Sequence, residues 1–210
     1  MELKEYFAKG LRLETERLIL RKISPSDSKD MYEYSCRPET TEYLLWEPHP
    51  YYSYTAELTR FLQREYAEGR YSDLAIVWRE NGKMIGTVGF TSYDPQNSCA
   101  EAGYVLSPDY WGRGIATEAL EALLSFAFCE LQLNRVEAKY ISGNSASLRV
   151  MEKCGMKREA MLRKKLFIKG QFRDIGICSI LKEDYFAVER ENIFDKSRHR
   201  SPISRLFHKN

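Results

Sequence analysis

The sequence predicts a single α/β domain built on one mixed sheet, and three observations lead to that prediction. Segments with the alternating pattern of strands and segments with helical spacing follow one another along the 210 residues. Asn81-Gly82, flanked by apolar runs, indicates a tight hairpin and therefore an antiparallel part of the sheet. Gly112 and Gly114 separate a strand-like segment from a long amphipathic helix. The content of 43% hydrophobic and 30% charged residues is ordinary for a globular domain.

The first predicted elements are a strand and two helices. Residues 15–23 have the alternation of a strand. Residues 24–35 predict a helix, because Ser24 is a good N-cap and Pro25 suits the first helical position. Residues 53–69 predict a second helix with apolar side chains along one face.

The middle of the chain predicts an antiparallel hairpin and the glycine turn. Residues 73–93 form the two arms of the hairpin, and residues 99–107 read as a further strand. After the glycines, apolar side chains recur with helical spacing from residue 115 to about residue 131.

The last predicted elements surround one more helix. Residues 134–142 predict a strand and residues 144–155 a short helix. Residues 157–182 predict two strands joined at Lys169-Gly170.

Charge is distributed unevenly along the chain. The net charge is +2, from 32 basic and 30 acidic residues. Residues 196–210 contain five basic residues and no acidic one, so 27 basic and 30 acidic residues remain and the rest of the chain is about −3. We therefore expect one domain over residues 1–185 and a basic, loosely ordered tail over residues 186–210. The tail could contact RNA phosphates of a ribosome or could simply be solvated. Its basic residues are Lys196, Arg198, Arg200, Arg205 and Lys209.

The cysteines and the N-terminus indicate a cytoplasmic protein without metal. The five cysteines are scattered, which excludes zinc-binding pairs and favours reduced thiols. The N-terminal residues are too charged for a signal peptide, and no apolar run approaches the roughly 20 residues of a membrane span.

The glycine turn predicts an anion-binding loop, because unpaired N–H groups gather where a helix begins. The chain has no Walker-type phosphate loop, and a dinucleotide fingerprint would need a third glycine where Thr117 stands. Two interpretations stay open: a cradle for a diphosphate, and a plain glycine turn before a core helix.

Several segments in order resemble the GNAT N-acetyltransferase superfamily. YWGRGIATEAL is similar to its acetyl-CoA signature, Gln/Arg-x-x-Gly-x-Gly/Ala, with Gly114 and Ala116 in the last two fixed positions. Trp111 stands in place of the Gln or Arg. The most similar branch is that of the RimJ/RimL ribosomal-protein N-terminal acetyltransferases, and the resemblance covers about residues 14–185. The segments that carry it are TERLILRKI, EAGYVLSPDYWGRGIATEAL, NRVEAKYISGNSASLRVMEKCGM and KGQFRDIGICSI.

The resemblance implies a GNAT fold, in which a sheet of about seven strands opens into a V between the fourth and fifth strands, with helices on both faces. Acetyl-CoA lies in that V, here between residues 99–107 and 134–142. The pantetheine amides are expected to pair with the backbone of Val105, Leu106 and Ser107. The expected diphosphate contacts are Gly112, Arg113, Gly114, Ile115, Ala116 and Thr117, although the Arg113 side chain could equally be solvated.

Direct attack of an amine on the thioester in a ternary complex requires a base, an oxyanion donor and a proton source for the thiolate. The resemblance assigns Asn144 and Ser147 to the pantetheine arm and the sulfur, although the same pair suits the cap of a short helix. Glu101 is a candidate base or a surface glutamate. Tyr140 is a candidate donor to the thiolate or a packing residue.

The acceptor is less well defined by the sequence. In this family the segment at residues 43–55 lines the acceptor groove, and its aromatic residues suit a peptide or a small amine alike. Within it, Glu47 is a weaker carboxylate candidate and His49 is expected to be exposed. The sequence therefore predicts an acetyl-CoA-dependent N-acetyltransferase acting on a protein α-amine of the ribosomal-protein type. A small-molecule amine (amino acid, polyamine or antibiotic) and a non-catalytic acyl-CoA-binding regulator stay open, as do monomer and homodimer.

Overall fold

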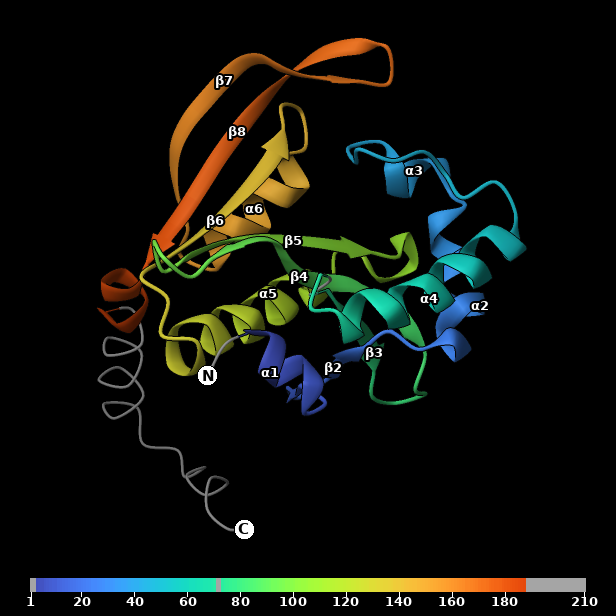
Figure 1. The fold of residues 1–210 in the computed structure, drawn as a ribbon. Coiled ribbons are helices and arrows are strands. Elements are labelled where there is room, and N and C mark those ends of the chain that lie inside the picture. Colours follow the sequence, from blue (N-terminus) through green and yellow to red (C-terminus); the bar gives the residue numbers. More distant parts are fainter. Residues whose placement is uncertain (1–2, 71–72, 188–210) are drawn as a thin grey trace.

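The computed structural model describes residues 3–70 and 73–187 (Figure 1). Its sheet has the strand order β1-β2-β3-β4-β5-β6-β8-β7, in which only β5 and β6 run parallel. The mixed α/β fold predicted from the sequence is confirmed. The sheet has eight strands rather than about seven, because the three-residue β1 is too short to show a pattern. The strands are β1 Arg12–Glu14, β2 Leu18–Lys22, β3 Leu74–Trp78, β4 Met84–Asp94, β5 Cys99–Leu106, β6 Arg135–Ile141, β7 Lys157–Ile168 and β8 Gln171–Leu181.

The helices largely follow the predicted boundaries. Ser24 caps a 3₁₀ turn at Pro25–Asp27 with a full capping box, and α2 follows directly. The long central helix changes into a π-helical turn at Phe126–Glu130 instead of continuing evenly to about residue 131. α1 and α3, which are short, were not predicted from the sequence. The α-helices are α1 Leu3–Ala8, α2 Ser28–Ser35, α3 Pro38–Thr41, α4 Tyr52–Ala67, α5 Ile115–Ser125 and α6 Ser145–Lys153.

The V in the sheet lies between β5 and β6. Their parallel pairing runs only from Cys99↔Arg135 to Ala102↔Ala138. Beyond that point β5 continues to Leu106, pairing with β4, while β6 continues to Ile141, pairing with β8. The two strands therefore part after four paired residues, as the family resemblance implied.

The helices attach the two sides of the V to one core. α5 packs along β2, β4 and β5, while α6 packs against α5 and β6. Leu120, Leu123 and Leu124 of α5 are almost fully buried, so this helix is anchored along its length. α2 and α4 pack against each other beside β4.

The β7–β8 hairpin extends away from the rest of the sheet (Figure 1). Its last pairing with β6 is Ile141↔Ile175, so the part between residues 163 and 174 projects past the end of β6. The turn lies at Lys169-Gly170, as predicted, with positive φ at both residues. Lys169 Nζ donates a 2.7 Å hydrogen bond to the carbonyl oxygen of Thr41 in α3. The hairpin tip is thus tied to the segment between α2 and α4.

The basic tail predicted at residues 186–210 lies almost wholly outside the described residues, which end at residue 187. Within the described part of the chain, no helix combines the length and apolar character that crossing a membrane requires.

Candidate active site

The loop at residues 112–117 forms an anion-binding nest at the start of α5. Gly112 and Gly114 both have a φ of +74°, the left-handed conformation that favours glycine. Gly114 is the N-cap and offers no side-chain cap. The backbone N–H groups of residues 112–117 donate no hydrogen bond to any other described residue. Successive free N–H groups at a helix N-terminus favour an anion.

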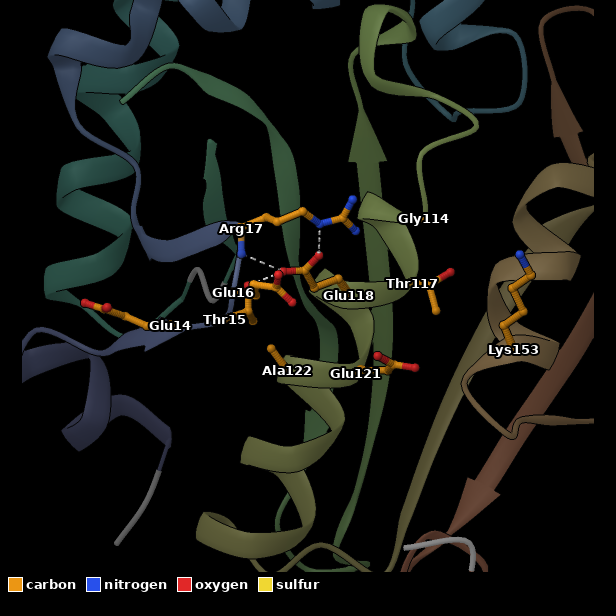
Figure 2. A pocket seen from close by; sticks show the side chains of 10 residues that line it. All are labelled: Glu14, Thr15, Glu16, Arg17, Gly114, Thr117, Glu118, Glu121, Ala122 and Lys153. Atoms are coloured by element: carbon orange, nitrogen blue, oxygen red, sulfur yellow. Dashed lines mark hydrogen bonds and ion pairs between the residues drawn. The ribbon is translucent and has the colours of Figure 1, made fainter. Parts of the chain in front are cut away.

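A brace formed by Thr15 and Arg17, in the turn between β1 and β2, holds this loop (Figure 2). The Arg17 guanidinium donates to Glu118 of α5 at 2.6 Å and to the carbonyl oxygen of Arg113 at 3.0 Å. Thr15 Oγ1 and the Arg17 N–H donate to the same Glu118 carboxylate. Burial opposes ionisation of Glu118, but these hydrogen bonds outweigh it and lower its pKa. The brace therefore fixes the first turn of α5 against β2.

The brace forms one side of a cavity of about 510 Å³. Figure 2 shows Lys153 of α6 on the other side, across from Thr117 and Glu121 of α5. The Arg113 side chain, which belongs to the nest loop, is exposed, with its guanidinium 5.4 Å from the centre of the Tyr110 ring.

The structure restricts which backbone groups of β5 face the V. The Ser107 N–H already donates to Ile85 at 2.7 Å, and the Val105 carbonyl oxygen lies against Gly86. Since peptide groups alternate in direction along a strand, Leu106 directs its N–H and C=O toward the V. Its carbonyl oxygen accepts from Trp111 Nε1 at 2.8 Å. Of the three predicted pantetheine partners, Leu106 alone keeps its backbone N–H directed into the V.

Asn144 and Ser147 begin α6 on the β6 side of the V. Asn144 Oδ1 accepts the Ser147 N–H at 3.0 Å, so the capping role considered from the sequence is present. The Ser147 hydroxyl lies 2.8 Å from the hydroxyl of Tyr104, which also donates to the Ser147 carbonyl oxygen at 2.9 Å. Burial raises the pKa of Tyr104, so this phenol stays protonated at neutral pH.

Tyr104 is not among the site residues predicted from the sequence. The alternation of β5 places it on the same face as Ala102 and Leu106, a face that the pattern assigns to the core. Its partner Ser147 is 43 residues away along the chain. Only the three-dimensional fold brings the two hydroxyls together.

Glu101 lies where β5 and β6 part, one residue before the last paired position. Its carboxylate accepts a hydrogen bond from Lys139 of β6 and is partly exposed. Alternation places Glu101 on the face of β5 opposite to Tyr104. The Glu101 carboxylate and the Tyr104–Ser147 hydroxyls therefore lie on opposite faces of the sheet, near the point where β5 and β6 part.

Tyr140 is buried and packs across β8. A Cβ atom added at Gly176 would overlap the Tyr140 ring. Because β8 lies on the side of β6 away from β5, the ring points away from the V. Of the two roles considered from the sequence, donation to the thiolate and packing, this geometry favours packing.

His49 is buried, contrary to the expectation of an exposed loop residue. Its Nδ1 lies 2.9 Å from the Ser35 hydroxyl and 2.8 Å from that of Thr55. The backbone N–H of His49 donates to the Ser35 carbonyl oxygen. Burial lowers the pKa of His49. His49 therefore joins the segment after α3 to α2 and α4, while Glu47 points toward Lys169 at 3.6 Å.

Over residues 3–70 and 73–187, no group of three His, Cys, Asp or Glu side chains is arranged to hold a metal ion. The chemical groups around the V are a nest of free N–H groups, the open edge of β5, two hydrogen-bonded hydroxyls and one carboxylate. Such a set can bind an anionic, amide-containing ligand and exchange a proton beside it.

Comparison with known proteins points to one family. Residues 17–157 match the family described as acetyltransferase (GNAT) domain. The uncharacterized N-acetyltransferase p20 of Bacillus licheniformis is 34% identical over 173 residues, which cover 82% of this chain and 97% of p20. The putative ribosomal N-acetyltransferase YdaF of Bacillus subtilis (strain 168) is 27% identical over 174 residues, covering 81% of this chain and 94% of YdaF.

A more distant relative acts on a small amine, by its name. The spermidine N(1)-acetyltransferase of Vibrio cholerae is 23% identical over 169 residues, covering 80% of this chain and 95% of the relative. The crystal structure of an acetyltransferase (GNAT family) from Bacillus anthracis superposes with a TM-score of 0.74 at 26% identity. That superposition covers 82% of this chain and 99% of the other.

Proposed function

The chain belongs to the GNAT acetyltransferase family and is an N-acetyltransferase, and from that premise we propose that it transfers the acetyl group of acetyl-CoA to the α-amine of a protein N-terminus. The catalytic domain would be residues 1–185. The observation that carries the coenzyme part of the proposal is the set of six free N–H groups at residues 112–117. A diphosphate is the anion that such a nest at a helix N-terminus accommodates.

The rest of the coenzyme would follow the open edge of β5. The Tyr104 peptide group and the Leu106 N–H are directed toward the V and would pair with amides of the pantetheine arm, while the Leu106 carbonyl oxygen is held by Trp111. Lys153, across the cavity from Thr117, would add positive charge beside the phosphates. Asn144 is expected to hold Ser147 in place through the capping bond.

The chain's own residues would move two protons during transfer. Glu101 would accept a proton from the attacking amine, directly or through a water molecule. Ser147, connected to Tyr104 at 2.8 Å, would donate toward the sulfur as the acetyl–sulfur bond breaks. Holding amine and thioester together in one V supplies much of the rate.

Two relatives support different acceptors, since one is named a ribosomal N-acetyltransferase and the other a spermidine N-acetyltransferase. We place the protein N-terminus first because the overall similarity to YdaF is higher. A small polyamine is the second candidate.

A thiol-release assay with acetyl-CoA tests the proposal against peptide N-termini, polyamines, aminoglycosides and free amino acids. Gly114→Trp should abolish turnover and coenzyme binding by filling the nest. Gly82→Trp is the matched control, because Gly82 has a similar φ of +73° in the β3–β4 turn, outside the nest, with open space around it. Turnover of a peptide, lost only in Gly114→Trp, supports the proposal. Wild-type protein that does not bind acetyl-CoA would overturn it, and binding without turnover of any amine would favour a regulator.

A further inference from the structure

The projecting part of the β7–β8 hairpin lies beside the opening of the V. β8 extends beyond its last pair with β6, Ile141↔Ile175, and the Ser142 N–H donates to the Asp174 carbonyl oxygen. Asn144 and Ser147 follow within a few residues of that point. Arg173 is two residues past Ile175, so it lies about 7 Å beyond the end of β6.

Three consecutive cations interrupt the pairing of β7 with β8 next to Arg173. Leu162 pairs with Ile175 and Leu166 with Arg173, so residues 163–165 (Arg-Lys-Lys) bulge opposite the single residue Asp174. All three side chains are exposed. Asp174 Oδ1 accepts the backbone N–H of Lys164, which holds the bulge in this shape.

Four cations of the projecting hairpin have no ion-pair partner among the described residues. Of the seven Lys and Arg between residues 157 and 174, three form ion pairs, with Asp184, Glu152 and Glu47. The four without a partner are Arg163, Lys164, Lys165 and Arg173.

The segment at residues 38–51, which the hairpin tip contacts, does not carry enough free carboxylates to neutralise these four cations. This segment contributes one carboxylate, Glu42, that forms no ion pair with another described residue, since Glu39 pairs with Arg37 and Glu47 with Lys169. Asp174 of the hairpin is a second such carboxylate, so the described residues of the two segments contain two carboxylates and four cations without an ion pair. The Lys169–Thr41 hydrogen bond joins the two segments at the hairpin tip.

We propose that this cationic hairpin selects acceptor proteins that carry acidic residues shortly after their N-terminal residue. The inference rests on the proposed function, because it assumes that the α-amine enters the V. An extended peptide advances about 3.3 Å per residue, so its third to sixth residues would pass the four cations. The same positive charge repels a polyamine, which favours the protein acceptor over the small cationic one.

Two other roles for these cations lead to different results. Lysines and a bulge on an exposed edge strand also prevent edge-to-edge association of sheets. A cationic hairpin can also bind RNA phosphates without regard to any peptide. The measured quantity must therefore be the preference among peptides.

The experiment measures kcat/KM of the full chain on three peptides. All begin with Ala-Ser and continue with four acidic, four uncharged or four basic residues. Arg163→Glu/Lys165→Glu tests the hairpin, and Lys29→Glu/Arg60→Glu is the control with the same change in charge, because both of its residues are exposed on α2 and α4. Lys164 is left intact because its φ is positive. Thermal unfolding checks that each variant folds.

We expect the acidic peptide to exceed the uncharged one by about 10-fold in kcat/KM, with the basic peptide lowest. The ratio of acidic to uncharged should fall toward one in Arg163→Glu/Lys165→Glu and near about 0.5 M NaCl, but persist in the control variant at low salt. Arg163→Gln/Lys165→Gln should give an intermediate ratio.

Equal rates on the acidic and uncharged peptides overturn the inference and leave the proposed function standing. Turnover of spermidine without turnover of any peptide overturns the proposed acceptor itself. A hairpin variant that keeps the peptide ratio but loses binding to a short RNA, or that only aggregates, assigns the cations to one of the other roles and overturns the inference.

Discussion

Tyr104 of β5 and Ser147 of α6 face each other across the V, with their hydroxyl oxygens 2.8 Å apart. The Tyr104 hydroxyl has one proton and two acceptors on Ser147, the hydroxyl and the carbonyl oxygen. When it donates to the carbonyl oxygen, the Ser147 hydroxyl is free to donate elsewhere. Tyr104 is therefore a positioning residue for the hydroxyl that we place beside the sulfur.

Tyr104→Phe should lower kcat by about 3- to 10-fold, the value of one net hydrogen bond, with little change in the KM for acetyl-CoA. Ser147→Ala should lower kcat further. Because the two residues act as one unit, adding Tyr104→Phe to Ser147→Ala should have little extra effect. Steady-state kinetics of the three variants measure this coupling.

Ser145→Ala serves as the control on the same helix turn, since the Ser145 side chain is exposed and forms no hydrogen bond with another described residue. Additive losses in the double variant would show that Tyr104 and Ser147 act separately, and the positioning role would then be wrong.

Glu101→Gln should lower kcat/KM by about 100-fold if this carboxylate accepts the amine proton, since general bases contribute on that scale. Glu137→Gln is the matched control: Glu137 lies opposite Glu101 in the register of the neighbouring strand and forms an ion pair with Arg135. Stopped-flow thiol release at saturating acetyl-CoA measures both. Similar small losses in the two variants would assign Glu101 to the surface.

Arg17→Met should weaken acetyl-CoA binding by about 5-fold without changing the KM of the acceptor. The guanidinium holds Arg113 and Glu118 at the start of α5, and its partial exposure limits the effect through solvent screening. Calorimetric titration measures the Kd.

Arg12→Met removes a neighbouring surface ion pair, with Glu14, and should leave that Kd unchanged. A loss of thermal stability in Arg17→Met with an unaltered Kd would contradict the brace as part of the coenzyme site.

Stability should fall as the solution is acidified through the range of His49. Its pKa is lowered in the folded chain by burial, so near pH 6.5 and below the unfolded chain binds a proton that the folded chain does not. The free energy of unfolding should then decrease with falling pH by at most about 1.4 kcal/mol per unit. Urea denaturation between about pH 7.5 and about pH 5.5 measures the slope.

His49→Asn keeps a polar side chain near Ser35 and Thr55 but cannot titrate. Its stability at neutral pH should be lower, while its pH slope over this range should be smaller than that of the wild type. Equal slopes in both proteins would place the titrating group elsewhere.

Elements with a local physical signal were predictable from the sequence. The hairpin at Asn81-Gly82 and the turn at Lys169-Gly170 depend on positive φ values that few residues adopt. Gly112 and Gly114 predicted a turn before α5 for the same reason. Ser24 predicted a helix N-cap because its side chain can accept a backbone N–H. Each of these features is decided within a few residues of chain.

Features decided by tertiary contact were not predictable. His49 stands in a segment rich in prolines and aromatic residues, but burial depends on Ser35 and Thr55 from two other helices. Tyr140 and Tyr104 look alike in the strand pattern, and only the order β5-β6-β8 shows which ring faces the V. The resemblance to a family placed the V, but could not choose between the two phenols.

The donors of the nest at residues 112–117 are backbone N–H groups, which every amino acid except proline supplies. Exchange of the other side chains within this loop therefore leaves its donors in place. Trp111 can replace the family's Gln or Arg and turn its indole to the Leu106 carbonyl oxygen without removing a single donor from the loop. What the loop requires is the absence of a side chain at Gly112 and Gly114, where a φ of +74° favours glycine.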